Sequence, residues 1–123
     1  MTTSNRKTFL IPSTAIQPLA TGRGACLASD MITVDGRRVA YMYREAPDRD
    51  VDSGWRFMSG LEDDAYLNNP DNHGIYDVNT IANYDPDIIP FLDAPTGSAF
   101  ERDDGVGPFR EVDEFAPPDK PVN

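Results

Sequence analysis

The stretch Asp52-Ser53-Gly54-Trp55-Arg56-Phe57-Met58 predicts a turn that leads into a strand. Side chains alternate between the two faces of a strand, so Trp55 and Phe57 share one face and Arg56 lies on the other. Gly60 follows as a breaker. We therefore expect a strand over residues 55–58 with one strongly apolar face.

Further strands are expected on both sides of this stretch. Asp35-Gly36 lies between two β-rich runs, residues 32–34 and 39–43, and predicts a β-hairpin because both turn residues tolerate positive φ. In the second run, Tyr41 and Tyr43 alternate with Met42, which indicates that both faces are at least partly covered. The other strands are expected at residues 25–28, 75–78 and 98–102.

Two short segments favour helix. Acidic residues 62–64 come early in the run Leu61–Leu67, where carboxylates stabilise the positive end of a helix dipole. Asn79 is placed to cap a helix over residues 80–84. The sequence therefore predicts an α+β fold: a mainly antiparallel sheet of about four or five strands with two or three short helices.

The chain divides by composition into three parts. Residues 1–24 form a polar N-terminal arm broken by Pro12 and Pro18, and residues 25–102 form the ordered domain. Residues 103–123 form an acidic, Pro-rich tail, ordered in places at most, with Phe109 and Phe115 as potential anchors.

The chain is acidic, with 21 Asp and Glu against 11 Lys and Arg and a net charge of −10. Phosphate would be repelled, so direct binding to nucleic acid or to an anionic membrane is not expected. A basic protein partner fits this charge, and so does a role in solubility alone. Cys26 is the sole cysteine, and no signal peptide or long apolar run is visible, so we expect a cytoplasmic protein.

Residues suited to catalysis are few, and we predict no enzyme, no catalytic residue and no cofactor. His73, the only histidine, lies in an Asn/Asp/Gly turn cluster, and Cys26 lies in an apolar strand where a buried thiol is expected. Alternating acids over 48–52 resemble the start of a calcium loop, but Ser53 and Ser59 occupy the positions that need Gly and Glu. No metal site is therefore predicted. A hydrolase using two carboxylates stays open, and two buried acids of raised pKa would support it.

Residues 25–102 resemble the immunity protein 33 family. The blocks that carry the resemblance are Ser29-Asp30, Tyr41-Met42-Tyr43-Arg44-Glu45 with Pro47, Asp52-Ser53-Gly54-Trp55-Arg56-Phe57, Ser59-Gly60, Glu62-Asp63 with Tyr66, Ile75-Tyr76-Asp77 with Asn79, Asn83-Tyr84-Asp85-Pro86 and Ser98-Ala99-Phe100-Glu101-Arg102. The resemblance implies a small bacterial protein that binds and neutralises a cognate toxin, for example a basic nuclease. The alternative is a non-catalytic regulatory or scaffold module of unknown partner.

The acidic stretch 45–64 is the candidate partner-binding region, since aromatic anchors rimmed by charge are common in tight interfaces. Trp55 also fits a core position, and Asp52 also fits a turn cap. Charge reversal over residues 62–64 is expected to weaken binding to the toxin and to leave folding intact. The candidate partner-binding residues are Asp50, Asp52, Trp55, Glu62, Asp63, Asp64 and Tyr66.

Overall fold

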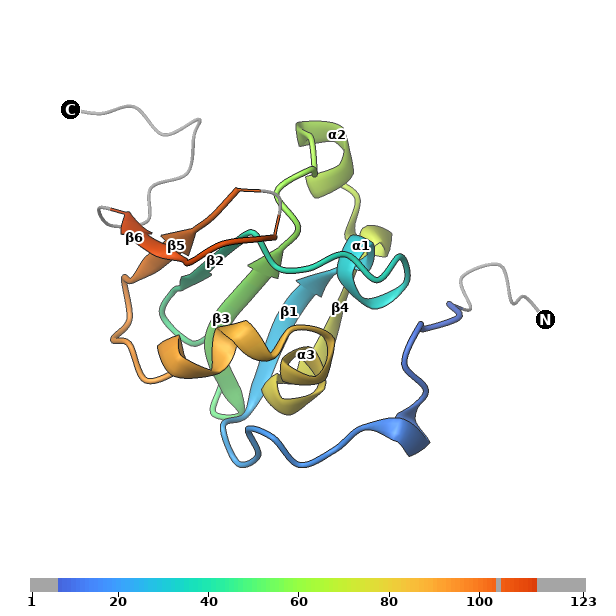
Figure 1. Ribbon diagram of the computed structural model, residues 1–123, viewed down its shortest axis with the longest axis horizontal. Coiled ribbons are helices and arrows are strands. Elements are labelled where there is room, and N and C mark those ends of the chain that lie inside the picture. The colour runs from blue at the N-terminus through green and yellow to red at the C-terminus, as the bar shows by residue number, and fades with distance from the viewer. Residues whose placement is uncertain (1–6, 104, 113–123) are drawn as a thin grey trace.

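A six-stranded mixed sheet is the framework of the chain (Figure 1). The computed structural model describes residues 7–103 and 105–112. Within them the strand order is β4-β1-β3-β2-β5-β6. The strands are β1 (Ala25–Ser29), β2 (Tyr41–Arg44), β3 (Asp52–Met58), β4 (His73–Asp77), β5 (Ala99–Glu101) and β6 (Arg110–Val112).

The strand pairing confirms the α+β class and corrects the details of the sheet. β1 and β3 are parallel, and the other four pairings are antiparallel. The sheet is therefore mixed, with six strands in place of four or five. The helices of the described residues are η1 (Ser13–Ala15), α1 (Asp30–Thr33), α2 (Asp64–Leu67), η2 (Pro70–Asn72), α3 (Val78–Tyr84) and η3 (Pro86–Phe91), of which the η elements are 3-10 helices.

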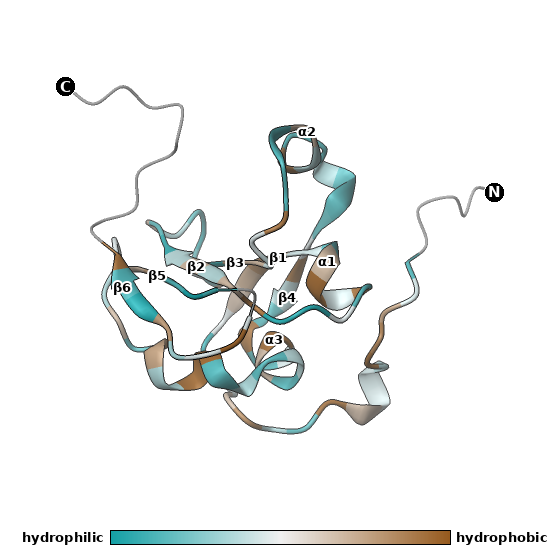
Figure 2. Cartoon of the chain, turned by 45° about the horizontal axis from the view of Figure 1, so that its top comes forward, coloured by the Kyte–Doolittle hydropathy of each residue, from teal (hydrophilic) through white to brown (hydrophobic). Residues whose placement is uncertain are grey.

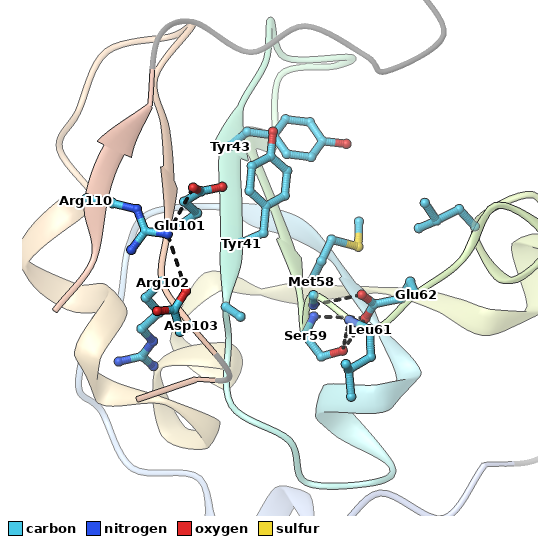
Figure 3. A pocket seen from close by; sticks show the side chains of 13 residues that line it. Tyr41, Tyr43, Met58, Ser59, Leu61, Glu62, Glu101, Arg102, Asp103 and Arg110 are labelled. Atoms are coloured by element: carbon cyan, nitrogen blue, oxygen red, sulfur yellow. Dashed lines mark hydrogen bonds and ion pairs between the residues drawn. The ribbon is translucent and has the colours of Figure 1, made fainter. Parts of the chain in front are cut away.

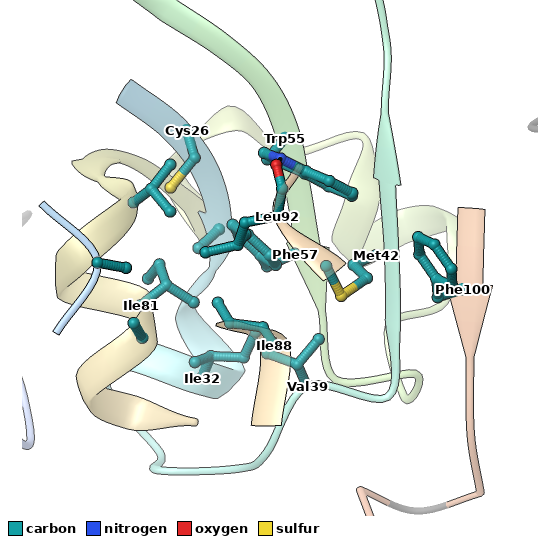
Figure 4. Packing of buried hydrophobic residues seen from close by; sticks show 14 residues of the cluster. Cys26, Ile32, Val39, Met42, Trp55, Phe57, Ile81, Ile88, Leu92 and Phe100 are labelled. Carbon is teal, nitrogen blue, oxygen red and sulfur yellow. Dashed lines mark hydrogen bonds between the residues drawn. The ribbon is translucent and has the colours of Figure 1, made fainter. Parts of the chain in front are cut away.

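The core lies between one face of the sheet and the layer formed by α1, α3 and η3 (Figure 1, Figure 4). Trp55 and Phe57 point into this layer from β3, as the alternation predicted, and their rings stack with centroids 6.0 Å apart. The Trp55 indole N–H donates to the Leu92 carbonyl at 3.2 Å, so its polar atom is satisfied inside the core. Ile32, Ile81 and Ile88 complete the packing from the helical side.

The prediction of a β-hairpin around Asp35-Gly36 is wrong, because residues 30–33 form the helix α1. Ser29 caps a helix instead, because its hydroxyl accepts a hydrogen bond from the Met31 N–H at 3.0 Å. Gly36 has φ +82° and donates to the Ile32 carbonyl, which ends the helical turn. The glycine thus serves a helix end, a role that also requires positive φ.

β3 contains an irregularity that shapes its first half. Its register to β1 moves from Ala25↔Asp52 to Leu27↔Arg56, so β3 uses two more residues than its neighbour over this interval. Gly54 lies in this bulge with φ +90°. A Cβ on Gly54 would overlap the Glu45 carbonyl oxygen, so the close approach of these two segments requires glycine.

The two helices expected from the sequence are present as α2 and α3, but the residue that caps α3 differs from the one expected. α2 begins after Asp63, whose carboxylate accepts from the Tyr66 N–H at 2.8 Å. α3 is capped by Asp77 rather than by Asn79. Asn79 instead holds the N-terminal arm: its Oδ1 accepts from the Leu19 and Ala20 N–H groups, each at 2.7 Å.

The sheet continues beyond residue 102, where the tail was expected to begin. β6 pairs with β5 through Ala99↔Val112 and Glu101↔Arg110. Phe109 packs edge-on against Phe91 at 5.4 Å between ring centroids, in agreement with its expected role as an anchor. Phe115, the other expected anchor, lies outside the described residues.

Candidate functional site

A groove of about 890 Å³ lies on the sheet face opposite the helical layer. We call it the β2 groove, because the side chains of Tyr41 and Tyr43 on β2 lie within it (Figure 3). One side is formed by the segment that follows β3 and by α2, and the other by β5 and β6. Its lining residues include Tyr41, Tyr43, Met58, Leu61, Glu62, Leu67, Glu101, Asp103 and Arg110.

Strand register brings the central side chains together. Tyr41 lies opposite Met58 on one side and Glu101 on the other, and Glu101 lies opposite Arg110. Directly opposed residues in antiparallel strands point to the same face of a sheet. The four side chains therefore form one row across four strands, from residues up to 69 positions apart in the sequence.

The floor of the β2 groove is apolar and aromatic. Tyr41 and Tyr43 lie 5.5 Å apart between ring centroids. Leu61 and Leu67 are 54% and 42% exposed, large values for leucine side chains that face a concave surface. Burial, with a smaller contribution from Glu45, raises the pKa of Tyr43 to about 12, and burial followed by Glu101 raises that of Tyr41. Both phenols therefore remain neutral near pH 7.

The rim of the groove is charged. Arg110 contacts Glu101 at 3.2 Å and Asp103 at 3.4 Å, and both pairs are exposed. Glu62 lines the other side, and Asp63 and Asp64 follow it at the start of α2. Figure 2 shows β6 as a predominantly hydrophilic strand. Carboxylates thus stand on both sides of an apolar floor.

Glu62 holds the segment that carries Leu61. Its carboxylate accepts from the Ser59 N–H and hydroxyl, each at 2.9 Å, and from the Gly60 N–H at 3.0 Å. Burial opposes ionisation, but hydrogen bonds from Ser29 and from this turn lower the pKa of Glu62. Glu62 therefore positions the groove wall.

Arg102 fixes the opposite wall. Its guanidinium binds the buried Asp85 carboxylate and contacts Asp87 at 2.8 Å. It also donates to the Gly107 carbonyl at 3.2 Å and lies 4.3 Å from the Phe109 ring centroid. These contacts attach the segment before β6 to the core and so place Arg110 beside Glu101.

Within the stretch of residues 52–56, the Arg56 guanidinium is held by two carboxylates, those of Asp52 and Glu45. Asp52 binds Arg56 through two oxygens, at 2.9 and 2.8 Å, and Glu45 binds the same guanidinium at 2.6 Å. In a regular strand, residues four apart are separated by about 13 Å. The bulge at Gly54 shortens this span enough for the pair to form.

Comparison with known protein families identifies the family of the chain. The family described as "Immunity protein Imm33 domain" matches residues 26–113, more than half of the chain.

The chain belongs to the Imm33 immunity protein domain family.

The match confirms the expected resemblance and extends past residue 102 through β6. No curated protein and no solved structure matches this chain. Among the described residues of this Imm33 domain, no helix has the length and apolar character needed to cross a membrane.

Two of the expected partner-binding residues are part of the fold. Trp55 is 1% exposed, so the structure removes it from the candidate surface, because its ring is enclosed by the core. Asp52 has little exposed surface, and both of its oxygens are engaged by Arg56. Each residue had a structural alternative in the sequence, and the geometry favours that alternative.

The remaining expected residues do not form one patch. Asp50 is exposed in the segment before β3, whereas Asp63, Asp64 and Tyr66 follow its other end (Figure 1). The length of β3 lies between these two groups. Tyr66 is partly buried, with its ring edge-on to His73 at 5.9 Å between centroids. Glu62 lines the β2 groove, and Asp63, Asp64 and Tyr66 follow it in the chain at the start of α2.

The groove residues on β2, β5 and β6 were not among the sequence candidates. Tyr41 and Tyr43 were expected in a strand with both faces covered, yet their side chains line an open surface. The alternation of Tyr41, Met42 and Tyr43 was the available signal, since Met42 alone is fully buried. Nothing local marks Glu101 and Arg110 as neighbours.

Cys26 and His73, the residues considered for catalysis, lie where their side chains serve the fold. Cys26 is buried as expected, and burial, reinforced by Asp77, raises the pKa of its thiol well above the usual range. His73 begins β4, and its Nε2 lies 3.3 Å from the Leu67 carbonyl. Within residues 7–103 and 105–112, no three His, Cys, Asp or Glu side chains gather as a metal site would require.

Proposed function

We propose that this Imm33 domain is an immunity protein that binds a cognate bacterial toxin and neutralises it by occluding the toxin's active site. Family membership supports the immunity role and a protein partner. The observation that carries the binding mechanism is the β2 groove, an open concave surface with an aromatic floor on a sheet whose other face is buried. Occlusion requires no catalytic group and no cofactor.

The net charge of −10 supports a basic partner such as a nuclease. A nuclease cleft carries positive charge to hold phosphate, and an acidic inhibitor complements that field. In this proposal the complex forms in the cytoplasm of the cell that makes both proteins. The residues offered to the toxin are those beside the groove, including Asp63, Asp64 and Tyr66, with Asp50 as a separate candidate.

Co-expression tests the proposal. The toxin encoded by the neighbouring gene is induced in a host cell with and without the full chain, and survival is scored. We expect rescue, and co-purification of a stoichiometric complex. Complex formation without rescue would favour the scaffold alternative, and absence of both would refute the immunity role for that toxin.

A further inference from the structure

We propose that the β2 groove is the toxin-docking surface and that it accepts a basic segment carrying an aliphatic or aromatic side chain next to a Lys or Arg. This inference rests on the proposed function and adds the surface and the chemistry of its occupant.

The first argument is the shape and polarity of the floor. Two tyrosine rings and two exposed leucines face a space of about 890 Å³. Tyrosines are common interface anchors, because a rigid ring buries a large area at small entropic cost. Leu61 and Leu67 lose unfavourable exposure to water only when an apolar group enters. The floor therefore selects an apolar side chain.

The second argument is the charge of the rim. Glu101 and Asp103 stand on one side and Glu62 on the other, and Asp63 and Asp64 follow Glu62 at the start of α2. Arg110 is the cation near the outer edge, 56% exposed, with contacts of 3.2 and 3.4 Å. Exposed ion pairs of this kind contribute little stability. A cation from the partner can therefore take over the carboxylates at small cost, while Arg110 turns to solvent.

The third argument excludes other occupants by charge. A second copy of this chain would bring another net charge of −10 to the interface. Nucleic acid and anionic lipid would also meet carboxylates. A basic protein segment is complementary to the rim and to the whole molecule.

The first experiment uses defined peptides and the full chain. The ¹⁵N-labelled protein is titrated with the amidated peptide Lys-Leu-Lys-Phe-Lys-Leu and with its Glu-for-Lys counterpart. We expect saturable shifts centred on Tyr41, Tyr43 and Leu67 for the basic peptide and none for the acidic one. Shifts centred elsewhere, equal shifts for both peptides, or none for the basic peptide would overturn the inference.

The second experiment uses variants with matched controls. Leu61→Ser with Leu67→Ser removes two exposed leucines from the groove, whereas Val51→Ser with Val106→Ser removes two valines of 64% and 65% exposure outside it. We expect the groove variant to weaken toxin binding about tenfold or more and the control to leave it within about twofold. Both variants should show the wild-type circular dichroism spectrum and thermal midpoint.

A second pair of double variants tests the contribution of the rim carboxylates. Glu101→Gln with Asp103→Asn removes the two carboxylates on the Arg110 side of the rim, and Asp48→Asn with Asp93→Asn removes the same charge elsewhere. We expect the rim variant alone to lose affinity for both the toxin and the basic peptide. If the wild-type chain rescues cells and the groove variants bind and rescue equally well, the docking surface is wrong and the immunity function stands. If the wild-type chain fails to rescue, the function fails, and the peptide titration still decides what the groove binds.

Discussion

At the scale of single residues, the most recognisable stretch of the chain serves the fold. Asp52, Arg56 and Glu45 satisfy one another on the open face of the sheet, while Trp55 satisfies its N–H inside the core. The bulge at Gly54 makes the Asp52–Arg56 contact feasible. These residues define a stable platform beside the proposed docking groove.

Replacing Asp52 tests this structural role. Asp52→Asn removes one of the two carboxylates that neutralise a nearly buried guanidinium and leaves Glu45 as the other, and we expect the free energy of unfolding to fall by about 2 kcal/mol. Urea denaturation at pH 7 measures the change. Asp50→Asn is the matched control, because Asp50 is exposed and should change stability by less than about 0.5 kcal/mol. Equal stability of the two variants would show that the ion pair contributes nothing.

The same carboxylate predicts a dependence of stability on pH. Hydrogen bonds from Arg56, partly opposed by burial, hold the pKa of Asp52 well below its usual range. The unfolded chain takes up this proton near pH 3.9, whereas the native state does so only at lower pH. The contribution of Asp52 is thus fully present above about pH 4 and is lost as the pH falls further. Urea midpoints measured from pH 7 to pH 2.5 should decline less steeply for Asp52→Asn than for the wild-type chain.

Substitutions at Gly54 and Gly97 separate the cost of a positive φ from the cost of a steric clash with a new Cβ. Gly54→Ala places a methyl group against the Glu45 carbonyl at φ +90°. Gly97→Ala imposes a similar φ of +98° with open space around the new methyl group. We expect about 1 kcal/mol of destabilisation for Gly97→Ala and at least about 3 kcal/mol for Gly54→Ala. Thermal unfolding followed by circular dichroism gives both values, and equal losses would mean that the bulge relaxes freely.

At the scale of elements, α3 holds the N-terminal arm as well as the core. Asn79 accepts from the Leu19 and Ala20 N–H groups and donates to the Gln17 carbonyl at 2.9 Å. The side chain thereby completes three backbone hydrogen bonds that no strand supplies. The arm is an ordered extension of the domain from Gln17 to β1.

Asn79→Ala should release this arm. Two backbone N–H groups lose their acceptor, so we expect a loss of about 2 kcal/mol in stability and faster cleavage in the segment before β1. Limited proteolysis with mass spectrometry locates the cut. Asn83→Ala is the comparison, because the partly exposed Asn83 side chain binds the N–H and carbonyl of Gln17 alone in this arm, through exposed hydrogen bonds. Equal cleavage of the two variants would place the attachment elsewhere.

The elements show which parts of this fold were predictable. The strands expected at residues 25–28, 39–43 and 55–58 follow from short apolar or alternating runs, and β1, β2 and β3 confirm their existence. The Asp35-Gly36 hairpin failed because positive φ serves a helix end as well as a turn. β6 has three residues with little apolar signal, and it forms because Arg102 and Phe109 attach the preceding segment. The groove depends on register between distant strands, which local patterns do not encode.

At the scale of the whole molecule, charge and shape have separate roles. The net charge of −10 acts over the distance of approach, whereas the β2 groove acts at contact. Long-range attraction changes the association rate, and buried anchors change the dissociation rate. The two contributions can therefore be measured independently on one complex.

Ionic strength should separate them. The Debye length falls from about 30 Å at 0.01 M salt to about 3 Å at 1 M, so the association rate with a basic toxin should fall about tenfold or more over this range. The dissociation rate should change little. In stopped-flow measurements, Leu61→Ser with Leu67→Ser should raise the dissociation rate and keep the wild-type salt dependence of association, because these leucines carry no charge. An association rate independent of salt would mean that the acidity of this chain does not steer its partner, and the groove alone would then account for recognition.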